Sequence, residues 1–323
     1  MAEPIYVALR PIASDKTIHF CATDGTTNYR KSVTSKTLER NSIYPVNLST
    51  TETTGTALEF LTASYEAQDG ETLSGILLGK YAISTASTTG DATITVTLNG
   101  VDINHHYPIS IHAPGINCQG NINLVLADGS VNYITASIAG YAGIFITGSR
   151  TLTISGNGSL TATGKGNSSS SSDRKCGYIT ISNGNVTATG GQYGAGIGCS
   201  KDGSCTDGIE ISGTADVTAT GGDYGAGIGS TYAVSRNSSC GDILIDGTAT
   251  VKATGGEYAA GIGSGRGTNS SSQSICGTIT IKSDVTSVIA TKGNPAYDSI
   301  GKGTFNSECG AVFIEYPSKV TQN

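Results

Sequence analysis

Carboxylate side chains recur at one position of a repeated sequence, where they could act on a sugar. Asp223 and Glu257 occupy equivalent positions in two copies of the repeat, and Gln192 occupies that position in the preceding copy. If the copies stack as neighbouring strands about 4.8 Å apart, the two carboxylates approach the separation used by retaining glycosidases. Stacking alone produces this spacing, however, and the repeat places no Arg or Lys nearby. We therefore expect solvated turn residues rather than a catalytic pair.

A tyrosine follows each of these positions. Tyr193, Tyr224 and Tyr258 each lie four residues before the isoleucine of a Gly-Ile-Gly motif, and Tyr297 is nearly aligned with them. Such rings could form a strip that stacks on sugar rings, or they could stack on one another and cover a glycine-rich corner. Both interpretations are open from the sequence. If the rings are exposed, Tyr224→Ala should weaken binding and leave the fold nearly intact.

Cysteines also recur at one point of the repeat. The five in question are Cys176, Cys205, Cys240, Cys276 and Cys309, out of eight in the chain. Residues at one point of stacked coils form a column, and a buried free cysteine behaves as a small hydrophobic residue. We expect a column of mostly free thiols, with Cys199 and Cys205 as the pair most suited to a disulfide across a short loop. The cysteines do not settle the redox compartment.

The sequence does not favour binding of a metal ion, a cofactor or nucleic acid, or attachment to a membrane. His105 and His106 are adjacent and would face opposite sides of a strand, while His19 and His112 are scattered, so no metal-binding spacing emerges. The glycine-rich stretches lack the context of a phosphate loop, and we expect no cofactor. The net charge is −6 with no basic run, which argues against nucleic acid. Membrane attachment would require an anchor that this sequence does not contain.

The repeat itself predicts the fold. Three clear copies begin at Cys176, Cys205 and Cys240, the first reading CGYITISNGNVTATGGQYGAGIG, and weaker copies lie on either side. Each contains three short segments of alternating apolar and threonine residues separated by glycines, which indicates strands that bury one side. Strands this short need copies of themselves above and below, as in a solenoid. We therefore predict an all-β chain forming a right-handed parallel β-helix, with coils of about 31 to 37 residues.

Two regions are distinguished. Residues 53–323 are assigned to the β-helix, and residues 1–52 to a small antiparallel β unit with a turn at Asp24-Gly25. The unit is too short to hold a core alone, so it should act as a cap or be the remnant of a larger domain.

Two resemblances add to this interpretation. The segment from Gln68-Asp69-Gly70 through the GAGIG copies is similar to β-helix repeat domains of secreted and surface proteins of gut bacteria, some of them carbohydrate-binding. Ile5 to Leu48, ending in KTLERNSIYPVNL, resembles the closing strands of a fimbrillin-like domain of Bacteroides-type pili and adhesins. These resemblances imply an adhesin that is extracellular or on the outer cell surface. Met1-Ala2-Glu3-Pro4 has no export signal, so we expect the leader to be missing from this sequence.

Three functions follow in order of preference. The first is an adhesin or binding module that recognises a glycan or a host or bacterial surface receptor, because no unique acid–base cluster stands out. The second is a polysaccharide lyase or glycoside hydrolase, and the third is a structural stalk or fibre component without a ligand. The predicted binding residues are Tyr193, Tyr224, Tyr258, Asp223 and Glu257.

Overall fold

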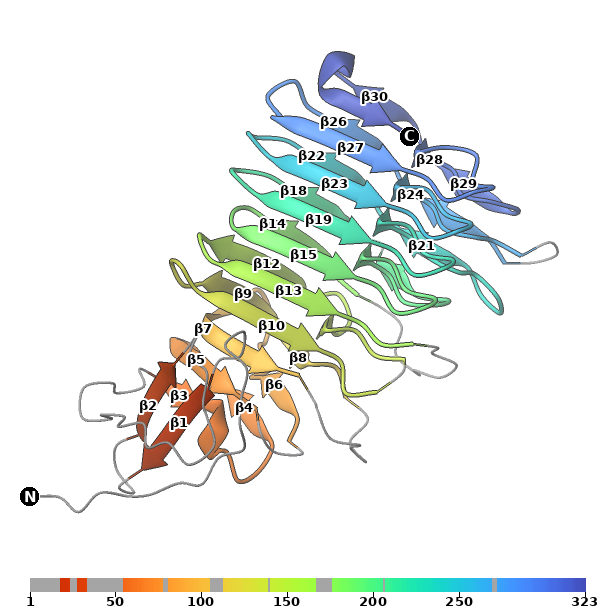
Figure 1. Ribbon diagram of the computed structural model, residues 1–323. Coiled ribbons are helices and arrows are strands. Elements are labelled where there is room, and N and C mark those ends of the chain that lie inside the picture. Colours follow the sequence, from red (N-terminus) through yellow and green to blue (C-terminus); the bar gives the residue numbers. More distant parts are fainter. Residues whose placement is uncertain are drawn as a thin grey trace, which may run out of the picture.

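The chain folds into an elongated right-handed parallel β-helix whose coils stack along one axis (Figure 1). The computed structural model describes residues 18–23, 28–33, 55–77, 81–104, 113–138, 140–166, 176–205, 207–268 and 272–323. Within these residues the helical segments are the single turns η1 (Leu58–Phe60) and η2 (Pro317–Lys319). No helix among them is long and apolar enough to cross a membrane.

Two faces of the solenoid belong to one continuous 17-stranded parallel sheet. The first face contains β9 (Asn121–Leu126), β12 (Thr151–Gly156), β14 (Tyr178–Ile181), β18 (Ile209–Ile211), β22 (Ile243–Ile245), β26 (Ile279–Ile281) and β30 (Val312–Ile314). The second contains β10 (Val131–Thr135), β13 (Ser159–Thr163), β15 (Asn185–Thr189), β19 (Asp216–Thr220), β23 (Thr250–Thr254), β27 (Ser287–Thr291) and β31 (Val320–Gln322). At the N-terminal end, β3 (Thr56–Ala57), β5 (Glu71–Ile76) and the long β7 (Thr93–Ile103) complete the sheet.

The remaining faces consist of short strands in three four-stranded sheets. Early coils contribute β4 (Tyr65–Ala67), β6 (Ile83–Thr85), β8 (Ile116–Cys118) and β11 (Ile144–Ile146). Later coils contribute the Ile-Gly strands β16 (Ile197–Gly198), β20 (Ile228–Gly229), β24 (Ile262–Gly263) and β28 (Ile300–Gly301). Each of these coils adds a cysteine strand: β17 (Ser204–Cys205), β21 (Ser238–Cys240), β25 (Ser274–Cys276) and β29 (Ser307–Cys309).

The cysteine strands correct the expectation of three strands in each coil. They lie in Ser-rich segments of variable length. From the sequence we interpreted these segments as loops, because they lack an alternating pattern of apolar and polar residues. Coil length agrees closely with the predicted range of about 31 to 37 residues: Ile243 pairs with Ile279, which is 36 residues on, while Ile179 pairs with Ile209, which is 30 residues on.

Identical apolar residues stack on one another in the core. Ile181, Ile211, Ile245 and Ile281 follow one another in register along the first face and are fully buried. The residue directly before each of these isoleucines, such as Thr180 before Ile181, points outward, because successive strand residues alternate sides. Stacking therefore buries the side of each short strand that no single coil could cover.

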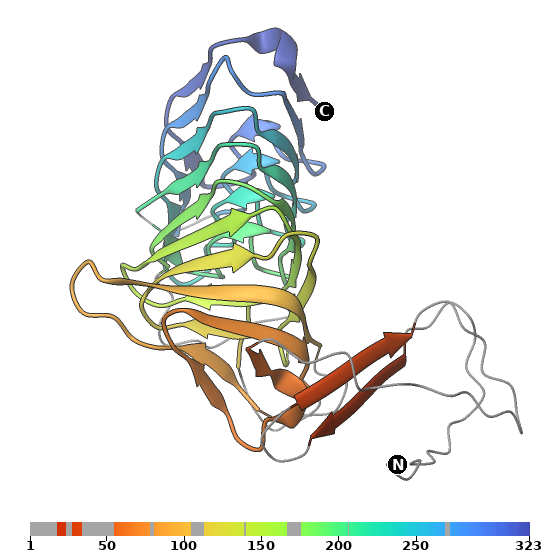
Figure 2. The same ribbon diagram turned by 90° about the vertical axis from the view of Figure 1, so that its left-hand side faces the viewer.

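A separate antiparallel pair precedes the solenoid. Strands β1 (Ile18–Thr23) and β2 (Asn28–Val33) form a two-stranded sheet of their own (Figure 2). The predicted turn at Asp24-Gly25 and the segments that resemble a fimbrillin-like domain on either side of this pair lie outside the described residues. The division into 1–52 and 53–323 stays a prediction.

The cysteine column is present, but its disulfide differs from the predicted one. Cys205, Cys240, Cys276 and Cys309 pair in register from coil to coil. Cys176 and Cys205 form a disulfide with their Cα atoms 4.6 Å apart, a distance that stacking of neighbouring coils supplies directly. Cys199 is a free thiol, and its Sγ donates to the carbonyl oxygen of Ser239 at 3.0 Å. Pairing across the short loop was therefore the wrong expectation.

Candidate binding surface

Tight turns fix the position of each tyrosine at the corner between the second face and the Ile-Gly strands. The amide of Gly194 donates to the carbonyl of Gly191 at 2.8 Å, and the Gly225–Gly222 pair repeats this bond at 3.0 Å in the next coil. The paired glycines are needed because the coils are close: a Cβ on Gly222 would collide with the carbonyl oxygen of Gly191. Three successive coils therefore place Tyr193, Tyr224 and Tyr258 at the same corner.

The tyrosine rings stack on one another along the solenoid. Ring centroids of Tyr193 and Tyr224 are 5.3 Å apart, and those of Tyr224 and Tyr258 are also 5.3 Å apart with the planes only 9° from parallel. Tyr232, from the other side of the Ile-Gly strand, stacks on Tyr224 at 4.7 Å. A face of each ring is thus occupied by a neighbouring ring, so a ligand would meet mainly ring edges and hydroxyl groups.

A second column of side chains completes the stack, and it contains basic residues. Backbone hydrogen bonds connect Asp202 to Tyr232, Ala233 to Arg266 and Gly267 to Thr304 in successive coils. They place Lys201, Tyr232 and Arg266 above one another. We call Tyr193, Tyr224, Tyr258, Tyr232, Arg266 and Lys201 together the tyrosine ladder.

Arg266 is held by aromatic rings. Its guanidinium carbon lies 5.1 Å from the centroid of Tyr224, 4.9 Å from that of Tyr258 and 4.6 Å from that of Phe305. Lys201 makes a similar contact, with Nζ 5.2 Å from the centroid of Tyr193. The repeat in the sequence showed no Arg or Lys beside the carboxylates, whereas the structure places Arg266 and Lys201 against the tyrosines that adjoin them. The three residues of the second column differ in type and lie in segments of unequal length, so no repeat in the sequence revealed them.

Removing the guanidinium of Arg266 should lower the stability of the protein by a measurable amount. We expect Arg266→Ala to lower the free energy of unfolding by about 1–2 kcal/mol, because the cation contacts several partly desolvated rings. Arg266→Lys should retain part of this stabilisation, since an ammonium keeps the charge but not the planar stacking surface. Denaturant titration of both variants beside the wild type measures the difference. Equal stability of all three would contradict the role assigned to this contact.

The predicted acidic residues lie beside the ladder and face solvent. Asp223 and Glu257 are exposed in successive coils. The amide Nε2 of Gln192 donates to a carboxylate oxygen of Asp223 at 3.1 Å. A hydrogen bond to the Glu257 carboxylate raises the pKa of the Tyr258 hydroxyl above its usual value. Gln192, Asp223 and Glu257 thus form a polar row along the aromatic stack.

Tyr297 departs from the column in the last coil. Its side chain is 62% exposed, and Phe305 instead approaches Tyr258 with a centroid distance of 6.5 Å. The structure therefore brings together Tyr193, Tyr224 and Tyr258 but not the nearly aligned Tyr297.

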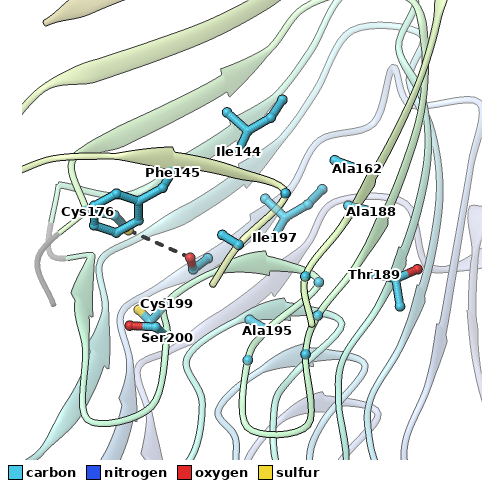
Figure 3. A pocket seen from close by; sticks show the side chains of 18 of the residues that line it. Ile144, Phe145, Ala162, Cys176, Ala188, Thr189, Ala195, Ile197, Cys199 and Ser200 are labelled. Carbon is cyan, nitrogen blue, oxygen red and sulfur yellow. Dashed lines mark hydrogen bonds between the residues drawn. The ribbon is translucent and has the colours of Figure 1, made fainter. Parts of the chain in front are cut away.

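An apolar cavity of about 150 Å³ lies inside the solenoid between β11 and β16 (Figure 3). Ile144, Ile179 and Ile197 contribute to its lining, and Cys176 and Cys199 border it. The Sγ atoms of Cys176, Cys199 and Cys205 lie within 4.8 Å of one another, a grouping that soft metals favour as thiolates. Two of these sulfurs are joined in the disulfide, so the group does not offer three thiolates. His105, His106 and His112 and the side chain of His19 lie outside the described residues.

Comparison with known proteins identifies the repeat. Residues 152–173, 179–201, 209–232 and 243–266 match a family model described as a beta helix repeat. The last three matches end at Lys201, Tyr232 and Arg266, so the matched unit runs from the first face to the ladder. No curated protein and no solved structure matches the chain. These segments are therefore similar to beta helix repeats, in agreement with the parallel solenoid that the strand pairing shows.

Proposed function

We propose that this chain is a binding module, displayed outside the cell, that recognises a glycan along the tyrosine ladder. The observation that carries the proposal is the polar row of Gln192, Asp223 and Glu257, which repeats at the coil spacing beside a stack of tyrosine edges. Carboxylate and amide oxygens accept hydrogen bonds from sugar hydroxyls, and tyrosine supplies apolar area together with a polar tip.

The geometry suits an extended ligand better than a compact one. Neighbouring coils present similar groups about 4.8 Å apart, so one long chain can contact several coils at once. Each contact is weak alone, and several contacts within one ligand raise the overall affinity. Arg266 and Lys201 add donors with fixed positive charge at the same corner.

An extracellular or cell-surface location agrees with the Cys176–Cys205 disulfide, because disulfides persist mainly in oxidising compartments. On this proposal the partners are a glycan or a surface receptor that carries one. The adhesin role and the likeness to Bacteroides-type surface proteins belong to the same proposal.

A glycan array probed with the purified protein tests this function, together with a screen for polysaccharide cleavage. We expect selective binding to extended glycans and no turnover. Cleavage of a polysaccharide at enzymatic rates would instead support the lyase or hydrolase alternative. Absence of binding to any glycan or surface receptor would favour a structural stalk.

A further inference from the structure

The cysteines form a continuous column of sulfur atoms along one side of the solenoid. The backbone pairs Cys205 with Cys240, Cys240 with Cys276, and Cys276 with Cys309, each time between neighbouring coils. Cys176 continues the column, since its amide donates to the carbonyl of Ser204 at 2.9 Å. Five cysteines from five successive coils therefore follow one another at the strand spacing.

Each neighbouring pair in this column lies at a strand spacing close to the Cα–Cα distance of the pair that is already bonded. Cys176 and Cys205 form their disulfide with a Cα–Cα distance of 4.6 Å. Parallel strands hold the register pairs about 4.8 Å apart, and disulfides accept Cα–Cα distances of roughly 4.4–6.8 Å. A disulfide at any of the three other steps would therefore require little movement of the backbone.

The two ends of the column differ in their access to solvent. Cys205, Cys240 and Cys276 are buried, and Cys176 is only 9% exposed. Cys309, in the last coil, is partly exposed. An external thiol therefore meets the column most readily at Cys309, three coils from Cys205.

We propose that the column is a thiol–disulfide exchange chain, in which one disulfide migrates between Cys176–Cys205 and Cys276–Cys309 and reacts at Cys309 with small external thiols and disulfides. The thiolate of Cys240 attacks Sγ of Cys205, the Cys176–Cys205 bond breaks, and the Cys205–Cys240 bond forms. Cys176 leaves as a thiolate and takes up the proton that Cys240 released. No net oxidation occurs, so no external oxidant is needed for this step.

Two further exchanges of the same kind complete the path. Cys276 attacks Cys240 and releases Cys205, and Cys309 then attacks Cys276 and releases Cys240. At the exposed end, an external thiolate attacks Sγ of Cys309 and releases Cys276 as a thiol. A second external thiol then frees Cys309 and leaves as an external disulfide. One protein disulfide is reduced to two thiols while two external thiols are oxidised.

Neighbouring thiols favour thiolates at alternate positions of the column. The thiols of Cys199 and Cys276 lower the pKa of Cys240, and that of Cys276 lowers the pKa of Cys309. Thiolate is the attacking form in disulfide exchange, and Cys240 and Cys309 attack in the first and the last exchange. Cys276 attacks in the middle exchange, and there its neighbours Cys240 and Cys309 raise its pKa, so this step is the slowest of the three.

Reduction of the buried disulfide by glutathione tests the proposal in the full chain. The Cys176–Cys205 bond is followed by alkylation and peptide mass spectrometry under native conditions. We expect Cys309→Ser and Cys276→Ser to slow its reduction at least tenfold, although neither residue touches this bond. Cys118 is a buried free cysteine in an earlier coil, so Cys118→Ser is the matched control and should reduce at the wild-type rate.

Equal rates in the wild type and Cys309→Ser would overturn the proposal, because they would show direct attack on Cys176 or Cys205. A second measurement avoids dependence on the folding of the variants. In wild-type protein quenched during reduction, we expect glutathione attached to Cys309 or a disulfide between Cys276 and Cys309. Glutathione attached only to Cys176 or Cys205 would contradict the migration.

Discussion

Gly229→Ala is expected to destabilise the solenoid by about 3–5 kcal/mol. Gly229 has a φ of +136°, and Gly198, Gly263 and Gly301 have the same conformation to within a few degrees. Residues with a Cβ rarely adopt this conformation. An added Cβ would also collide with the carbonyl oxygen of Gly263 in the next coil, and the main chain that it meets belongs to a paired strand.

A substitution at a second glycine separates the cost of the positive φ from the cost of the collision with the next coil. Gly129 also has a positive φ, +69°, but a Cβ there would meet nothing within 4 Å. Gly129→Ala should therefore show only the conformational cost of about 1–2 kcal/mol. Denaturant unfolding of both variants measures the difference. If Gly229→Ala were no more harmful than Gly129→Ala, close stacking at the Ile-Gly strands would be wrong.

Tyr224→Ala is expected to lower the free energy of unfolding by about 2–3 kcal/mol. Tyr224 stacks between Tyr193 and Tyr258, contacts Tyr232 and carries Arg266 over its face. The sequence left two interpretations open, and a loss of binding with little loss of stability was expected only if the ring was exposed. The ring is instead partly buried in the ladder, so the substitution leaves a gap between neighbours.

Tyr224→Phe is the matched control for this prediction. It keeps the ring and its stacking while removing the hydroxyl, and we expect a change in stability within about 0.5 kcal/mol. Thermal or denaturant unfolding of the two variants distinguishes stacking from hydroxyl chemistry. Similar destabilisation by both substitutions would contradict the stacking role of the ring.

The regular strands and the cysteine column were predictable because both rest on short-range patterns. Alternation of Ile and Thr in segments such as 179–181 sets which side chains are buried, and the equal placement of cysteines predicts that they stack. The isoleucines accordingly form continuous buried columns, and Cys205 and Cys240 pair in register.

The basic part of the candidate site was not predictable in the same way. Lys201, Tyr232 and Arg266 align only after the turns and the Ile-Gly strands have been placed in space, and they share no residue type. The disulfide was missed for a related reason. Loop length suggested Cys199 with Cys205, whereas stacking between coils brings Cys176 to Cys205. Contacts between coils, rather than distance along the chain, decide both features.

The central claim, a glycan-binding surface along the ladder, is tested most directly by probing one glycan array with three proteins. These are the wild type, the double variant Asp223→Asn with Glu257→Gln, and the control Asp216→Asn. Asp216 is an exposed carboxylate in the same coil as Asp223 but lies in β19, away from the row. We expect the double variant to lose at least tenfold in binding, because charged acceptors contribute about 1.5–3 kcal/mol each, and the control to bind like the wild type. Glycan binding that is unchanged in the double variant, or lost equally in the control, would contradict the claim.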